Sequence, residues 1–158
     1  MGREFVDLID FKSKEFEVCD LGQGAGRGVF SRKQFKPGQL VMEIRGQVID
    51  EADYSSFYCM DLGKGRVLEP EVPGGLVNHS CDPNCQLVQL GKFHLGLEAL
   101  VNIEPGRELT YNYGWPADVG PQKCYCKSLK CRKYIVDPKE LPRLLKQIKK
   151  AKKKKSDK

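Results

Sequence analysis

Three cysteines near the end of the chain form the pattern that most constrains how this sequence can fold. Cys124, Cys126 and Cys131 lie within eight residues in a C-x-C-x4-C spacing. A structural Zn²⁺ takes four tetrahedral ligands, with thiolate sulfurs at about 2.3 Å, so three local thiols need a fourth ligand from elsewhere. Seven cysteines are an odd number for a disulfide framework, and clustered thiols in a reducing compartment more often bind metal. The pattern therefore predicts a zinc site that joins residues 124–131 to another segment.

A second unusual stretch, residues 75–85, reads GLVNHSCDPNC. An apolar pair near its start and Pro83 near its end predict a buried strand that runs into a polar turn. Buried amides and imidazoles are costly unless each finds a hydrogen-bond partner. Such a polar segment between apolar runs indicates a ligand site or a metal site.

The length of 158 residues suits a single domain, since ordinary domains run from about 100 to 200 residues. No apolar run approaches the roughly 18 residues that a membrane span needs. Residues 1–6 lack both the apolar core of a signal peptide and the Ser or Thr of a myristoylation site. We therefore expect a soluble, intracellular protein with no membrane partner.

The net charge of +6 is concentrated at the C-terminus. Residues 139–158 hold ten Lys or Arg against two acidic residues, which leaves 17 basic and 19 acidic residues in the rest of the chain. A protein that binds nucleic acid through its fold would carry the excess on its body. The lysine run at residues 149–155 is typical of a solvated, disordered tail, which is also a candidate contact for nucleic acid or chromatin.

Most of the remaining chain shows short strand patterns separated by turn residues, which predicts a mainly β protein. Residues 22–28 form a glycine-rich loop, either a tight hairpin or a loop that presents main-chain groups to a ligand. Residues 40–49 predict two strands bent at Gly46, and residues 63–65 predict a hairpin turn. The other predicted strands are residues 16–19, 57–62, 66–68, 86–90 and 93–97.

One helix is predicted after the cysteines. Asp137, Pro138 and Glu140 have the types expected at the N-cap, N1 and N3 positions of a helix. The apolar residues that follow recur at helical spacing; they are Leu141, Leu144, Leu145 and Ile148. We expect this helix to end near residue 150.

Four segments in order resemble the motifs of SET-domain protein lysine methyltransferases: residues 26–30, 78–85, 99–115 and 124–131. The resemblance covers about residues 16–134. It implies a SET-domain fold of small twisted β-sheets with a knot-like C-terminal threading, a short post-SET zinc segment and a C-terminal helix. The implied boundaries are a SET domain at 16–115, a post-SET zinc segment at 116–136, a helix at 137–150 and a disordered Lys-rich tail at 151–158.

The same resemblance implies the site residues. Tyr113 matches the catalytic tyrosine, Tyr111 a position that limits the number of methyl groups added, and Tyr58 an aromatic of the lysine channel. The fourth zinc ligand is implied to be Cys81, with Cys85 as the alternative. The residues implied to bind S-adenosylmethionine are Gly26, Arg27, Gly28, Asn78, His79, Tyr113 and Trp115.

The activity implied is transfer of a methyl group from S-adenosylmethionine to lysines of a histone or another basic protein. Tyr111, rather than Phe, favours mono- or dimethylation. SET domains often carry an Arg three residues before the motif Asn, where this chain has Gly75, so any contact of that Arg is replaced or absent. The expected location is nuclear or chromatin-associated if the source is eukaryotic or the protein is delivered to a host, and cytoplasmic otherwise. The sequence predicts no oligomeric state.

Two other functions are consistent with the residues. One is a catalytically inactive SET module that binds basic peptides or chromatin, against which the intact Asn78, His79 and Tyr113 argue. The other is a nucleic-acid or chromatin-binding protein whose lysine tail makes the contact.

Overall fold

The structure is a computed structural model that describes residues 11–22, 26–51 and 53–156. Residues 23–25 of the predicted glycine loop, the N-terminal residues 1–6 and the last two tail residues lie outside this part. The chain forms two compact units, each described by itself below. Unit 1 comprises Met1–Asn78 and Asn84–Thr110, and unit 2 comprises His79–Pro83 and Tyr111–Lys158.

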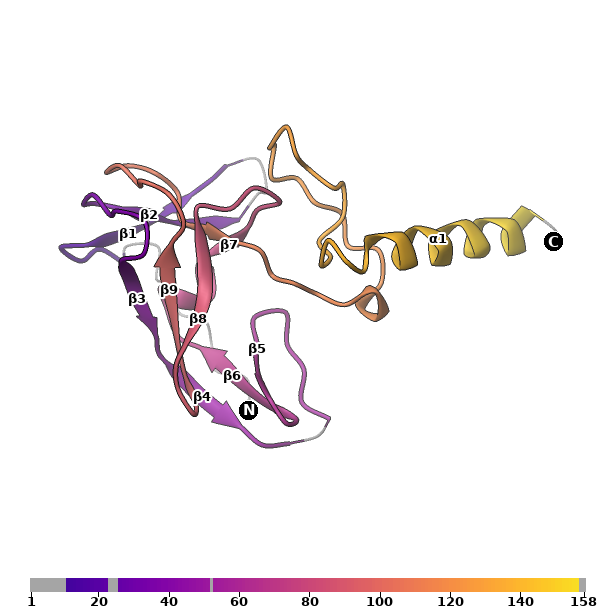
Figure 1. Ribbon diagram of the computed structural model, residues 1–158, viewed down its shortest axis with the longest axis horizontal. Coiled ribbons are helices and arrows are strands. Elements are labelled where there is room, and N and C mark those ends of the chain that lie inside the picture. The colour runs from indigo at the N-terminus through magenta and orange to yellow at the C-terminus, as the bar shows by residue number, and fades with distance from the viewer. Residues whose placement is uncertain (1–10, 23–25, 52, 157–158) are drawn as a thin grey trace. The chain divides into compact units, whose positions relative to one another are not determined.

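Unit 1 is built from small antiparallel sheets (Figure 1). The first pairs β1 (Phe16–Asp20) with β2 (Arg27–Ser31). In the second, β9 (His94–Ala99) lies between β3 (Leu40–Ile44) and β8 (Cys85–Gly91). In the third, β6 (Arg66–Pro70) lies between β4 (Gly46–Ile49) and β5 (Met60–Gly63). The mainly β architecture is the one that the strand patterns predict.

Turn geometry and close backbone approach explain two glycines of unit 1, Gly65 and Gly46. The turn between β5 and β6 has Lys64 at φ 55° and Gly65 at φ 75°, as a two-residue hairpin loop of the primed type requires. At Gly46, a Cβ would lie 2.1 Å from the carbonyl oxygen of Glu69 on the paired strand. The predicted turn and the break between the two strands of residues 40–49 are both present.

The start of β5 differs from the predicted strand at residues 57–62, because the observed strand begins at Met60. The hydroxyl oxygen of Ser56 accepts hydrogen bonds from the N–H groups of Tyr58 and Cys59, at 3.1 and 3.0 Å. Such local side-chain bonds compete with a strand ladder for backbone donors. Residues 57–58 therefore form a bend, and Cys59 lies outside the strand.

Two very short strands, β7 (Asn78–His79) and β10 (Thr110–Tyr111), form a further sheet, and the division between the units falls within each of them. A 3-10 turn, η1 (Gly74–Leu76), precedes β7.

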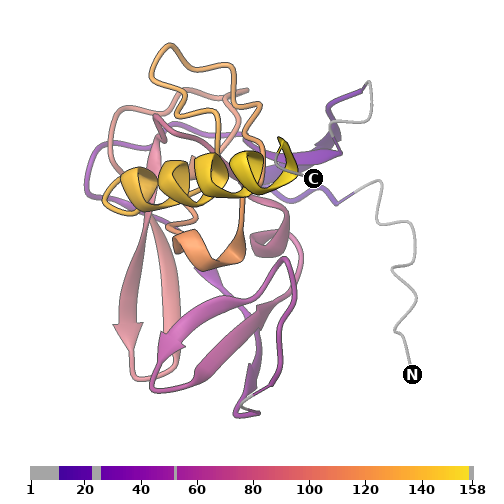
Figure 2. The same ribbon diagram turned by 90° about the vertical axis from the view of Figure 1, so that its right-hand side faces the viewer.

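Unit 2 contains a 3-10 turn, η2 (Ala117–Val119), and the helix α1 (Leu141–Ser156), shown in yellow in Figure 2. The apolar core of unit 2 is small. It consists of the buried Ala117, Val136 and Leu144, with the partly buried Tyr134, Leu141 and Ile148 around them. Asp137 makes the predicted capping bonds, because its carbonyl accepts the N–H of Leu141 at 3.1 Å and its carboxylate accepts the N–H of Lys139 at 2.7 Å. The helix itself begins at Leu141, after a turn at residues 138–140, and not at residue 137 as predicted.

The helix continues to Ser156, beyond the predicted end near residue 150 and through most of the predicted tail. Alanine and lysine have high helix propensity. The last-turn residues Lys153, Lys154 and Lys155 also interact favourably with the negative end of the helix dipole. No helix in the described part of the chain has the length and apolar character needed to cross a membrane.

Two adjacent leucines of α1 test the assigned core of unit 2. Leu144 is fully buried, whereas Leu145 is 47% exposed. Leu144→Ala should lower the free energy of unfolding by about 2–5 kcal/mol, and Leu145→Ala by about 0.5 kcal/mol or less. Chemical denaturation followed by circular dichroism measures both, and equal losses would contradict this packing.

Candidate metal centre and active site

Four cysteine sulfurs come together in unit 2. The Sγ atoms of Cys81, Cys124, Cys126 and Cys131 all lie within 4.8 Å of one another. The N–H of Cys124 donates to the carbonyl of Lys133 at 2.9 Å, which folds the segment of the last three cysteines back on itself. All seven cysteines lie in the described residues and none forms a disulfide.

The spacing and chemistry of these sulfurs are compatible with Zn²⁺. Thiolates at about 2.3 Å from a tetrahedral ion lie about 3.8 Å from one another, and the sulfurs of Cys81 and Cys124 are 3.7 Å apart. A donor set of sulfur alone favours zinc over hard cations such as Mg²⁺. Cys85, the alternative fourth ligand, is not in the group; it is fully buried in β8, where burial raises the pKa of its thiol to about 12.

The four cysteines differ in the pKa of their thiols. Burial raises the pKa of the Cys81 and Cys124 thiols. Burial also acts to raise the pKa of Cys126, but hydrogen bonds from the backbone of Cys81 and Ser128 and from the neighbouring thiols lower it to about 6. Cys126 is therefore the thiol poised to ionise near neutral pH, and a bound ion would displace the protons of the others.

His79 lies next to the sulfur cluster and contacts the tyrosine segment. Burial, with a further contribution from the positive charge of Arg132, lowers the pKa of His79 to about 4, so the ring is neutral at pH 7. Its Nδ1 accepts the backbone N–H of Tyr113 at 3.1 Å, which places the proton on Nε2. That nitrogen lies 3.5 Å from the sulfur of Cys81 and is oriented to stabilise a metal-bound thiolate.

Three predicted aromatic residues form a cluster in the same unit. The ring of Tyr113 lies 4.9 Å from that of Tyr111 and 5.4 Å from that of Trp115, measured between centroids. The ring of His79 meets the Tyr113 ring edge-on at 5.3 Å. Tyr111 is buried, whereas Tyr113 and Trp115 are partly buried. Unit 2 therefore brings together His79, Tyr111, Tyr113 and Trp115.

Unit 1 brings together the other predicted cofactor residues. The side-chain amide of Asn78 donates to the carbonyl of Arg27 and to the carboxylate of Glu108, both at 2.9 Å. Gly28 is buried against the same groups, since a Cβ there would lie 2.6 Å from the Glu108 carboxylate. Gly26 is exposed and adopts φ +77°, a conformation that favours glycine.

The predicted channel aromatic, Tyr58, also lies in unit 1. Its side chain is 45% exposed and its backbone N–H is held by the Ser56 hydroxyl in the bend before β5. Its assignment to a lysine channel stays a prediction.

Two contributions were not predicted from the sequence. Glu108 orients Asn78, and the only sequence signal for it is its position in the segment before Tyr111 and Tyr113. Arg132 contributes as well, because its guanidinium donates to the Cys81 carbonyl at 3.3 Å and to the Asn112 side chain at 3.0 Å. Contacts between residues this far apart in the chain leave no periodic signal in the sequence.

The cysteine cluster predicts a stoichiometry. Purified, reduced protein should contain one zinc ion per chain, and Cys126→Ser should lower this severalfold because oxygen replaces the thiol poised to ionise. Cys59→Ser is the matched control, since Cys59 lies outside the cluster and should retain full occupancy. Elemental analysis after gel filtration measures all three, and metal-free wild-type protein would refute the site.

Comparison with known proteins identifies the same family that the sequence motifs resemble. Residues 26–114, more than half of the chain, match the family model of the SET domain. The chain is 31% identical over 144 residues to histone-lysine N-methyltransferase ASHH2 of Arabidopsis thaliana, covering 78% of this chain and 8% of that protein. It is 32% identical over 154 residues to the H3 lysine-36 specific histone-lysine N-methyltransferase of Emericella nidulans, covering 84% of this chain and 15% of that protein.

Among solved structures, the chain is similar to KRYPTONITE in a crystal structure with mCHH DNA, an H3(1–15) peptide and SAH. The TM-score is 0.64 at 30% identity, over 76% of this chain and 29% of that one. The chain thus spans only a small part of each of these proteins. The predicted resemblance and the mainly β fold are confirmed: the chain belongs to the SET-domain family.

Proposed function

We propose that this chain is an S-adenosylmethionine-dependent protein lysine N-methyltransferase. The observation that carries the proposal is the cluster of Tyr111, Tyr113 and Trp115 held against His79 in a chain of the SET-domain family. The similar structure of KRYPTONITE contains SAH, the product that S-adenosylmethionine leaves after methyl transfer, together with an H3 peptide. Both support the cofactor and the reaction class.

The reaction requires a neutral lysine. S-adenosylmethionine supplies an electrophilic methyl group on a cationic sulfur. A lysine ε-amine, whose ordinary pKa is about 10.4, loses a proton to water, and its lone pair then forms the C–N bond as the C–S bond breaks. Aromatic side chains lower the pKa of such an amine by desolvation, and alignment supplies much of the remaining rate.

Within this scheme, we assign Tyr113 to orient the reacting amine through its hydroxyl, and Tyr58 to the wall of the lysine channel. Tyr111 limits the number of methyl groups that fit. We assign seven residues to the cofactor. They are Gly26, Arg27 and Gly28 through their main chain, with Asn78, His79, Tyr113 and Trp115.

The tight packing at Gly28 gives a test of cofactor binding. A Cβ there would lie 2.6 Å from the Glu108 carboxylate and 3.3 Å from the Asn78 amide nitrogen, so Gly28→Ala should displace both groups. We expect the Kd for S-adenosylmethionine to rise about tenfold, or by about 1.4 kcal/mol. Gly91→Ala, whose Cβ would meet its nearest atom at 3.5 Å, should bind as wild type. Isothermal titration calorimetry on folded variants compares them, and equal affinities would contradict the assignment.

The two tyrosines should respond differently to removal of the hydroxyl. Tyr113→Phe should lower kcat by about 100-fold or more while cofactor affinity is retained. Tyr111→Phe should keep turnover and shift the product towards trimethyllysine by up to about tenfold, since an ordered water contributes about 0–2 kcal/mol. Mass spectrometry of a basic protein substrate resolves the methylation states. An unchanged product ratio in Tyr111→Phe would remove its assigned role.

We propose a histone or histone-like tail as the substrate. The relatives are named histone-lysine methyltransferases, and the chain outside residues 139–158 carries 17 basic and 19 acidic residues, so a basic peptide meets no general electrostatic barrier there. Mono- or dimethylation is the favoured outcome, and a chromatin location follows from a histone substrate.

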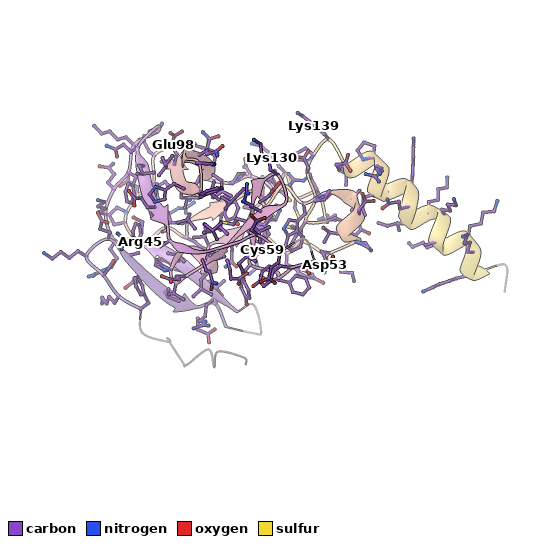
Figure 3. All side chains as sticks on the ribbon, turned by 90° about the horizontal axis from the view of Figure 1, so that it is seen from below. Arg45, Asp53, Cys59, Glu98, Lys130 and Lys139 are labelled. Atoms are coloured by element: carbon purple, nitrogen blue, oxygen red, sulfur yellow. The ribbon has the colours of Figure 1, made fainter. Side chains whose placement is uncertain are left out.

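We also propose that the lysines of α1 contact nucleic acid. The helix contains no acidic residue, and its side chains project from it in Figure 3. A shallow depression on one face is lined by Lys139, Pro142, Arg143, Lys146, Gln147 and Lys150. Arg143 is engaged by Asp118 and Glu140. The exposed lysines of the depression are then Lys139, which precedes the helix, and Lys146 and Lys150, which belong to α1.

Charge removal on α1 tests this contact. Lys146→Gln with Lys150→Gln should weaken binding to duplex DNA several-fold and reduce the slope of log K against log salt by about 2. The control removes two exposed lysines of unit 1, Lys14 and Lys36, by the same substitution. Fluorescence anisotropy at several salt concentrations measures the slope. A loss that is the same in the control would indicate a diffuse charge effect and contradict a contact through α1.

A further inference from the structure

Arg132, which directly follows the last cysteine of the cluster, makes three contacts within unit 2. Its backbone N–H donates to the sulfur of Cys81 at 3.3 Å. One guanidinium nitrogen, Nη1, donates to the carbonyl of Cys81 at 3.3 Å, and the other, Nη2, donates to Oδ1 of Asn112 at 3.0 Å. A single side chain therefore links the cysteine cluster to Asn112, the residue between Tyr111 and Tyr113.

Asn112 connects Arg132 to the backbone of residues 111–114. The same oxygen that accepts from Arg132 also accepts the backbone N–H of Gly114 at 3.3 Å. Gly114 adopts φ +63°, so the chain turns sharply just after Tyr113. The Asn112 oxygen thus holds the turn on one side and the guanidinium on the other.

The geometry points to Arg132 as a positioning residue. Resting on the proposed methyltransferase function, we infer that Arg132, acting through Asn112, fixes the turn that sets the orientation of Tyr111 and Tyr113. By this route the order of the cysteine cluster is transmitted to the tyrosines assigned to amine alignment and product state. Arg132 touches no reacting atom in this scheme, so its effect is on geometry.

The chemistry of the guanidinium explains why arginine is needed. Its planar fork holds two acceptors at a fixed separation, whereas the ammonium of lysine is a single point on a flexible stem. The third nitrogen, Nε, is buried without a hydrogen-bond partner, which carries a cost. The two hydrogen bonds from Nη1 and Nη2 therefore offset the cost of the unpaired Nε and fix the position of the side chain.

Two other bonds from residues 79–83 reach the same segment. The N–H of Ser80 donates to the carbonyl of Tyr111 at 3.1 Å, and Nδ1 of His79 accepts the N–H of Tyr113. These bonds hold the backbone on either side of Asn112 and do not involve its side chain. Loss of the Arg132 contact should therefore loosen the turn without unfolding unit 2.

The variants separate positioning from charge and from folding. Arg132→Lys keeps the charge and removes the fork. Asn112→Leu keeps the shape and removes the acceptor, whereas Asn112→Asp retains an acceptor and should rescue. The control is Lys130→Met, because Lys130, labelled in Figure 3, pairs with Asp82 at 2.9 Å and joins the same two segments. That exposed ion pair does not contact residues 111–114, so its loss should have little effect on their backbone or on the methylation products.

The first measurement does not depend on activity. With zinc content verified at one ion per chain, amide hydrogen exchange at residues 111–115 should quicken about tenfold in Arg132→Lys and Asn112→Leu, because a hydrogen bond to a charged group is lost. Asn112→Asp and Lys130→Met should exchange within about twofold of wild type. Unchanged exchange in both Arg132→Lys and Asn112→Leu would overturn the inference.

The second measurement is the product ratio together with kcat and KM. A purely structural role would reduce the active fraction and leave both the ratio of methylation states and KM unchanged. Positioning predicts an altered ratio and a lower kcat in Arg132→Lys and Asn112→Leu, with Asn112→Asp close to wild type. Equal losses in Asn112→Asp and Asn112→Leu would contradict it. If wild-type protein transfers no methyl group, the proposed function fails, and the exchange measurement still decides whether Arg132 holds the turn.

Discussion

The convergence of four cysteine sulfurs, in a group that could hold one ion, is the constraint on which unit 2 depends. Its apolar core is small, with Ala117, Val136 and Leu144 as its buried members, and few elements of regular structure precede α1. A metal bound by folded thiols contributes its binding free energy to folding. The cluster therefore holds residues 79–83 against residues 124–131 where hydrophobic burial is limited.

The same constraint orders the chemistry around it. Cys81 is two residues from His79, whose neutral ring presents Nε2 to the sulfur and Nδ1 to the backbone of Tyr113. Arg132 contacts both Cys81 and Asn112, and the Asn112 oxygen also accepts the N–H of Gly114, the residue after that tyrosine. Cys81, the imidazole of His79 and the backbone of Tyr113 thus form one hydrogen-bonded chain. Removal of the proposed ion is therefore expected to disturb the tyrosines as well as the fold.

Features specified by local residue type were predictable from the sequence. The cysteine spacing, the Lys64–Gly65 turn, the cap at Asp137 and the aromatic run at residues 111–115 each follow from a few adjacent residues. Cys81 was chosen over Cys85 through the family resemblance, and the structure places Cys81 in the cluster.

Features that depend on distant side chains were not predictable. Glu108 meets Gly28 and Asn78 only after three separate segments have folded together, and Arg132 finds Asn112 across twenty residues. Local competition also misled the strand prediction at residues 57–59, where the Ser56 hydroxyl captures two backbone donors. The length of α1 was underestimated because a lysine run was interpreted as a solvated tail, although lysine is a good helix former.

The most direct test of the metal-centred account is X-ray absorption spectroscopy at the zinc K-edge on the purified protein. The account predicts a single shell of four sulfurs at about 2.3 Å with no nitrogen scatterer, since His79 uses its two nitrogens for Tyr113 and Cys81. A shell of three sulfurs with one nitrogen at about 2.0–2.1 Å would make His79 a ligand, and would contradict the hydrogen-bonded route from the metal cluster through His79 to the tyrosines.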